Sequence, residues 1–276
     1  MAAQPQRHFW HVNESAAIAI GKLAVKSNDP VLRSKEDWCW HAWAAIGAIY
    51  YPDHDQTNTG QPTYLIPREA YRGLPPDDPE DQKPDVVVIR FMTIANVLPP
   101  VATDRDILWI ECKAPDEDVP NRWKLCMNQA VTRLNNAHPN RRVFLILTTG
   151  LKWMPFLWDP PNQAAGMQQL PNANPQGLAF LMDRQAYPNK QDWLVDRRIC
   201  QIPQNLLPNQ AHISNQAIPN GQLAAGRLAI DTTRAYSIQF WDNAGQLANV
   251  AQLQYLENLF LMIRGQQFND ANPASF

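Results

Sequence analysis

Several features that mark common protein classes are missing from this chain of 276 residues. Only 11 glycines are present, and they form none of the glycine-rich loops that hold phosphate in P-loop or dinucleotide-binding domains. No apolar run reaches the roughly 18 residues needed to cross a membrane, and residues 1–7 lack the apolar core of a secretory signal. The sequence therefore predicts neither a membrane protein nor a nucleotide-binding domain of these two kinds.

An excess of charge of one sign is also missing. The net charge is −2 and the pI is near 6.3, whereas a protein held on nucleic acid by bulk charge is much more basic. Any nucleic-acid partner must therefore meet a local basic patch. The cysteines are few and form no C-x-x-C pair, so with no export signal we expect reduced thiols in an intracellular compartment, cytoplasmic or nuclear.

The residues that are present predict a mixed α/β (α+β) fold. Helical periodicity covers residues 13–26, a segment from Ser34 to Pro52, and residues 121–136. The 103–106 segment carries turn chemistry. Buried strands are predicted at five apolar or β-branched runs: residues 63–66, 86–89, 107–110, 143–147 and 153–158. The second and third of these strands are predicted to be antiparallel neighbours.

The composition changes after residue 158, where Asn, Gln and Pro become frequent. We therefore divide the chain into an N-terminal helical extension (1–33), a core (34–158) and a helical or irregular C-terminal region (159–276) that packs on the core. In that last region the sequence predicts a short helix at 192–199 and an amphipathic helix from Leu247 to Ile263.

Three ionisable residues are predicted to meet at one edge of the sheet. Asp85, after Pro84, stands at the start of one strand, and Glu111 and Lys113 stand at the end of the next. Glu111 and Lys113 share a face because they are two residues apart, whereas Cys112 points to the opposite, buried face. Two carboxylates and the backbone carbonyl of Cys112 suit a hard ion such as Mg²⁺ or Mn²⁺, and Lys113 adds a positive charge.

This pattern resembles the PD-(D/E)xK nuclease superfamily over residues 34–158. The resemblance implies a restriction-endonuclease-like core with a mixed four-stranded sheet flanked by helices. It also implies metal-dependent hydrolysis of phosphodiester bonds, with DNA favoured over RNA, by in-line attack of a metal-activated water. Homodimers occur in many members. Asp85 and Glu111 would be the metal ligands, together with the carbonyl of Cys112, and Lys113 would be catalytic.

The resemblance also assigns two supporting residues. A glutamine on the helix after Lys113 faces the metal site in some branches, and Gln129 is its counterpart here. In those branches a tyrosine follows four residues later, where this chain has Arg133. The family often adds a glutamate from the first core helix, for which Glu36 is better placed than Glu14.

Two other interpretations stay open. In the first, the chain is an inactive PD-(D/E)xK-like module that binds nucleic acid or protein. In the second, Glu111 and Lys113 form a solvated ion pair and Asp85 caps a loop. The local patch for phosphate contacts is basic and lies on the third helix and before the following strand: Arg122, Lys124, Arg133, Arg141 and Arg142.

Overall fold

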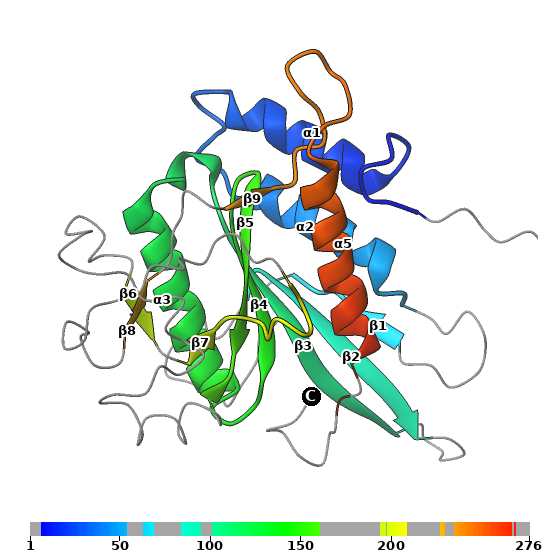
Figure 1. Cartoon of the computed structure of the whole chain (residues 1–276), viewed down its shortest axis with the longest axis vertical. Coiled ribbons are helices and arrows are strands. Elements are labelled where there is room, and N and C mark those ends of the chain that lie inside the picture. The colour runs from blue at the N-terminus through cyan, green and yellow to red at the C-terminus, as the bar shows by residue number, and fades with distance from the viewer. Residues whose placement is uncertain are drawn as a thin grey trace, which may run out of the picture.

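A mixed β-sheet with helices on both faces forms the centre of the molecule (Figure 1). The mixed α/β class expected from the sequence is therefore confirmed. The computed structural model describes residues 7–53, 63–68, 84–94, 101–160, 194–196, 198–208, 227–229, 235–266 and 268.

The strands on one side of the sheet form an antiparallel meander followed by a parallel neighbour. β1 (Thr63–Leu65), β2 (Val86–Ile94) and β3 (Val101–Lys113) pair antiparallel in that order. The chain then passes through the short helix η2 (Pro115–Glu117) and α3 (Pro120–Ala137) and returns as β4 (Val143–Thr149), parallel to β3. A parallel return needs a crossover of this length, and α3 supplies it.

The predicted count of four strands in the sheet is wrong, because the sheet has seven. β5 (Lys152–Trp158) pairs antiparallel with β4, and its other edge is shared by β7 (Ile199–Cys200) and β9 (Tyr236–Ser237). Pro155 lies between the two stretches of β5 that β9 and β7 pair. Because proline has no N–H to donate, a break in the edge pairing at this position is expected.

Two hydrophobic cores lie on the two faces of the sheet. On one face α3 packs its apolar stripe, with Trp123, Met127 and Leu134 fully buried, against β3, β4 and β5. The opposite face is covered by α2 (Asp37–Tyr50) and α5 (Val250–Gly265), with α1 (Ser15–Ser27) packed on α2 (Figure 1). α1, α3 and α5 match the predicted helices to within three residues at each end.

Three local predictions are wrong. Residues 103–106 do not turn but lie inside β3, where an extra residue, Ile107, bulges the ladder between the pairs Val88–Leu108 and Ile89–Asp106. Asp106 is buried there, and its carboxylate accepts from Trp109 Nε1 and contacts Nε2 of the distant His138. Residues 194–196 and 199–200 are strands β6 and β7, not a helix, and α2 begins after Glu36, not at Ser34.

Most of the described C-terminal segments belong to the main sheet and its cores. β7 and β9 extend the main sheet, α5 buries Leu256 and Phe260 against α2, and Ile202 is buried in the same core. A separate two-stranded sheet pairs β6 (Leu194–Asp196) with β8 (Arg227–Ala229). Among the described residues, no helix is both long and apolar enough to cross a membrane.

Candidate functional site

Pro84 and Asp85 end the pairing between β2 and β3, and they leave the backbone of Cys112 without its usual ladder partners. Val86 pairs with Ile110, so the continued register sets Pro84 opposite Cys112. Proline has no N–H to donate to the Cys112 carbonyl, and the Cys112 N–H donates to the Asp85 carboxylate, with 2.5 Å between the nitrogen and Oδ2. In an extended strand the N–H and C=O of one residue point to the same edge, so the Cys112 carbonyl also points toward Asp85.

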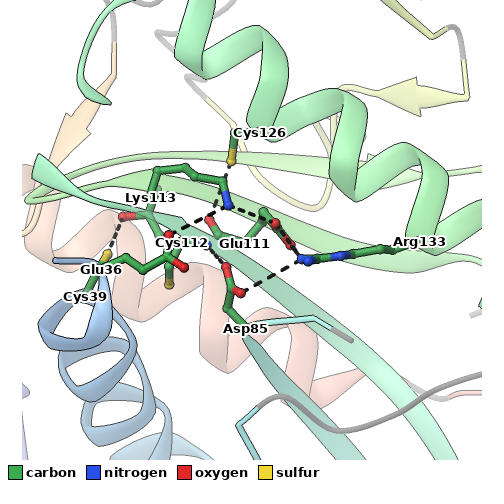
Figure 2. Close-up of polar contacts among 9 residues, drawn as sticks. Glu36, Cys39, Asp85, Glu111, Cys112, Lys113, Cys126 and Arg133 are labelled. Carbon is green, nitrogen blue, oxygen red and sulfur yellow. Dashed lines mark hydrogen bonds and ion pairs between the residues drawn. The ribbon is translucent and has the colours of Figure 1, made fainter. Parts of the chain in front are cut away.

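The carboxylates of Asp85 and Glu111 converge on the face of the sheet covered by α3 (Figure 2). Lys113, two residues after Glu111 on the same face, donates to Glu111 Oε1 with its Nζ at 3.4 Å. Cys112 between them points to the other face, where it is fully buried, as predicted. The sequence pattern therefore brings the three ionisable residues into one cluster.

Arg133 of α3 joins this cluster, and the sequence did not predict the contact. Its Nη1 lies 2.6 Å from both Oε1 and Oε2 of Glu111 and 3.9 Å from Oδ1 of Asp85 (Figure 2). The Arg133 side chain is 17% exposed, whereas that of Glu111 is 2% exposed. The guanidinium therefore lies beside both carboxylates, and these are more buried than the sequence pattern suggested.

Glu36 supplies a third carboxylate from the N-terminal end of α2. Its Oε2 lies 3.8 Å from Lys113 Nζ, and its side chain is 37% exposed. Glu14, the other glutamate considered, pairs with Arg7 instead. The ammonium of Lys113 thus lies between Glu36 on one side and Glu111 on the other. It links a carboxylate of α2 to a carboxylate of β3.

Burial dominates the protonation behaviour of the acids. Burial, together with the neighbouring Glu111 carboxylate, raises the pKa of Asp85 to about 7, against the lowering effects of Lys113, the Cys112 N–H and Arg133. Burial also raises the pKa of Glu111, against the effect of Arg133 and Lys113. Burial alone would lower the pKa of Lys113, but the carboxylates around it raise it overall, so the amine stays charged.

The oxygen donors at this site that could hold a metal come from two side chains and one backbone position. Among the described residues, no group of three or more His, Cys, Asp or Glu side chains is arranged around one point for a metal. A ligand set here would consist of Asp85, Glu111 and the Cys112 carbonyl, completed by water, as Mg²⁺ tolerates. The two buried carboxylates already face two cations here, the Arg133 guanidinium and the Lys113 ammonium.

The other predicted residues lie at varied distances from the cluster. Gln129 is one helical turn before Arg133 on the same side of α3 and is exposed. Arg141 and Arg142 precede β4, whose opposite end, Thr149, pairs with Lys113. Six residues of strand span roughly 20 Å, so these two arginines are not beside the acids.

The predicted basic patch is therefore divided. Arg142 pairs with Asp159 through Nε and Oδ1 at 2.8 Å, and Arg122 is exposed on α3. The side chain of Lys124 lies outside the described residues. Arg133 contacts the acid Glu111 and does not extend into solvent. The sequence feature that indicated this inward orientation is its position four residues after Gln129, next to the apolar stripe of the helix.

No protein-family model matches this chain, and neither the curated proteins nor the solved structures give a significant match. The geometry of the acids, the lysine and the arginine is therefore the basis for assigning a function.

Proposed function

We propose that this protein is a metal-dependent nuclease with a PD-(D/E)xK-type core, and that it hydrolyses phosphodiester bonds, those of DNA in the first place. The observation that carries the proposal is the meeting of Asp85, Glu111 and Lys113 at the ends of β2 and β3, with Glu36 on the far side of Lys113. Two acids, one lysine and an added glutamate at this position are the pattern that the superfamily uses.

The order of elements supports the same proposal. A helix, a three-stranded antiparallel meander, a crossover helix and a strand parallel to the third strand correspond to α2, β1–β3, α3 and β4. This is the arrangement implied by a restriction-endonuclease-like core. β5, β7 and β9 would then be additions to one edge of that core.

The residues have separate tasks in this proposal. Asp85, Glu111 and the Cys112 carbonyl would hold Mg²⁺ or Mn²⁺, which when bound activates water and neutralises phosphate charge. Lys113 keeps its proton because carboxylates lie on two sides of it, so it presents a fixed positive charge to the phosphate group. Glu36 orients that amine and is exposed enough to contact water.

A second function is favoured by one specific contact. Arg133 already pairs with the buried Glu111, so the acids have a counter-charge within the chain itself. A protein that uses the fold only to bind nucleic acid or another protein needs such a pairing, because an unpaired buried carboxylate is costly. This is the inactive-module alternative.

Cleavage assays separate the two functions. Purified full-length protein is incubated with single- and double-stranded DNA and RNA in the presence of Mg²⁺, Mn²⁺ or EDTA. We expect cleavage that requires the metal and is lost in Asp85→Asn. Cleavage that persists in Asp85→Asn would mean a contaminant or another site, and no cleavage of any substrate with either metal favours the module.

A further inference from the structure

We infer that Arg133 takes the place of a divalent ion on the Glu111 carboxylate, and that such an ion binds Asp85 and Glu111 only when this guanidinium leaves. The inference rests on the proposed metal site and adds a regulatory element to it. Arg133 would act as a lock built into α3, which raises the metal concentration that the protein needs.

The geometry carries the first step. Nη1 of Arg133 is 2.6 Å from both carboxylate oxygens of Glu111 and 3.9 Å from Asp85 Oδ1 (Figure 2). Oxygen ligands of Mg²⁺ or Ca²⁺ lie about 2.0–2.6 Å from the ion. Nη1 therefore already engages both Glu111 oxygens, which an ion bridging the two carboxylates would also need.

Charge makes the two occupants exclusive. Both the guanidinium and the ion are positive, and the site is largely removed from water, so their repulsion is weakly screened. The carboxylates cannot bind the guanidinium and the ion tightly at the same time. The free energy of the Arg133–Glu111 contact is consequently subtracted from the free energy of metal binding.

The Arg133 guanidinium can reach solvent by rotation of its side chain. Its side chain is long and partly exposed, and Gln129, one turn earlier on the same side of α3, is exposed. Rotation of the Arg133 side chain toward that end of the helix would bring its charged group to solvent without moving the backbone of α3 or β3.

Mn²⁺ binding to the full-length protein tests the lock without any nuclease assay. The variants are Arg133→Gln, which keeps hydrogen-bond donors but loses the charge, and Arg122→Gln, which removes the same charge at an exposed position of the same helix. Free Mn²⁺ is counted by electron paramagnetic resonance. We expect Arg133→Gln to lower the Kd about tenfold to hundredfold, the equivalent of one charge-assisted hydrogen bond, and Arg122→Gln to change it less than about threefold.

The Asp85→Asn variant makes the outcomes distinguishable. Asp85-dependent binding that is no tighter in Arg133→Gln would overturn the lock and leave the proposed metal site standing. Binding only in Arg133→Gln would support the lock and count against nuclease activity of the natural protein. No Asp85-dependent binding in either protein would overturn both proposals.

A second measurement covers the case in which Arg133→Gln does not fold. In the natural protein with ¹⁵N-labelled arginine, the Arg133 side-chain resonances should report restricted rotation and lose it when Mg²⁺ saturates the site. Arg133→Lys assigns the signals. Resonances of Arg133 that stay restricted with Mg²⁺ bound would overturn the lock.

Discussion

At the residue scale, Lys113 lies where its positive charge faces carboxylates from two elements. Its Nζ lies 3.4 Å from Glu111 and 3.8 Å from Glu36, and its side chain is 12% exposed. Removing it leaves both proposed ligand carboxylates in place. A substitution here therefore tests the positive charge and not the metal ligands.

We predict that Lys113→Ala lowers the rate of DNA cleavage about 10²–10³-fold, the usual effect of losing one preorganised charge. The variant should also unfold more easily by about 1–3 kcal/mol, because the buried Glu111 loses a donor. Cleavage rates are compared below the thermal midpoints of both proteins. Lys22→Ala, at an exposed position of α1, is the control and should cleave at the natural rate. Equal rates for Lys113→Ala and Lys22→Ala would remove Lys113 from the mechanism.

The protonation of Asp85 predicts a pH dependence of stability. An unfolded Asp releases its proton near pH 4, whereas burial and the Glu111 carboxylate raise the pKa of Asp85 to about 7 in the metal-free protein. Between these values the folded state binds more protons than the unfolded state. The free energy of unfolding therefore falls as the pH rises through this range.

Asp85→Asn removes the titrating proton, and the amide oxygen can still accept from the Cys112 N–H. In EDTA we expect its free energy of unfolding, relative to the natural protein, to increase by about 1–3 kcal/mol between about pH 4.5 and pH 8. Urea denaturation at both pH values measures the difference. Asp116→Asn, at an exposed position in η2, is the control, and a pH-independent difference for Asp85→Asn would contradict the prediction.

At the scale of elements, the turn between β4 and β5 holds the end of β3. Gly150 has a φ of +55°, in the left-handed region, and its N–H donates to the Lys113 carbonyl at 3.0 Å. A Cβ on Gly150 would lie 3.0 Å from the Cα of Pro115. Only glycine combines this backbone conformation with this close approach.

We predict that Gly150→Ala destabilises the protein by about 1–3 kcal/mol, because the strained backbone and the contact with Pro115 add. Gly21→Ala in α1 is the matched substitution: its Cβ meets nothing within 4 Å, and a helix interior favours alanine by about 0.5–1 kcal/mol. Urea denaturation should therefore move the two variants in opposite directions. A Gly150→Ala variant as stable as the natural protein would show that the turn does not constrain the end of β3.

At the scale of the whole molecule, the N-terminal and C-terminal parts share one core. Tyr51 donates to the Phe260 carbonyl at 3.3 Å, and Tyr50 donates to Glu257, which His8 also contacts. Phe260 is fully buried against both tyrosines. The face of the sheet opposite α3 is thus completed by a helix that lies more than two hundred positions away in sequence from α2.

We predict that neither residues 1–158 nor residues 160–276 fold alone. The first fragment would expose the apolar face that α5 covers, and the second has too little apolar surface of its own. Each fragment is expressed separately and followed by circular dichroism and urea denaturation, with the full chain as the control. A cooperative unfolding transition in residues 160–276 would show that the C-terminal region is an independent domain.

The sequence by itself determined the features that local periodicity encodes. The apolar stripes of α3 and α5 and the β-branched runs of β2, β3 and β4 were predictable, because each shows which face of an element is buried. The convergence of Asp85, Glu111 and Lys113 was predictable too. It needs only alternation along β3 and an antiparallel neighbour.

The tertiary structure alone decided the partners that lie far apart in sequence. Residues 103–106 look like a turn, yet in β3 Asp106 contacts Nε2 of His138 on another element, at 2.9 Å. Arg133 looks like a surface charge, yet it crosses from α3 to Glu111 because the β3–α3–β4 crossover lays that helix over the acids. Charge and polarity are local properties of a residue. Which partner neutralises a buried charge or hydrogen-bonds a buried polar group depends on the elements that the fold brings together.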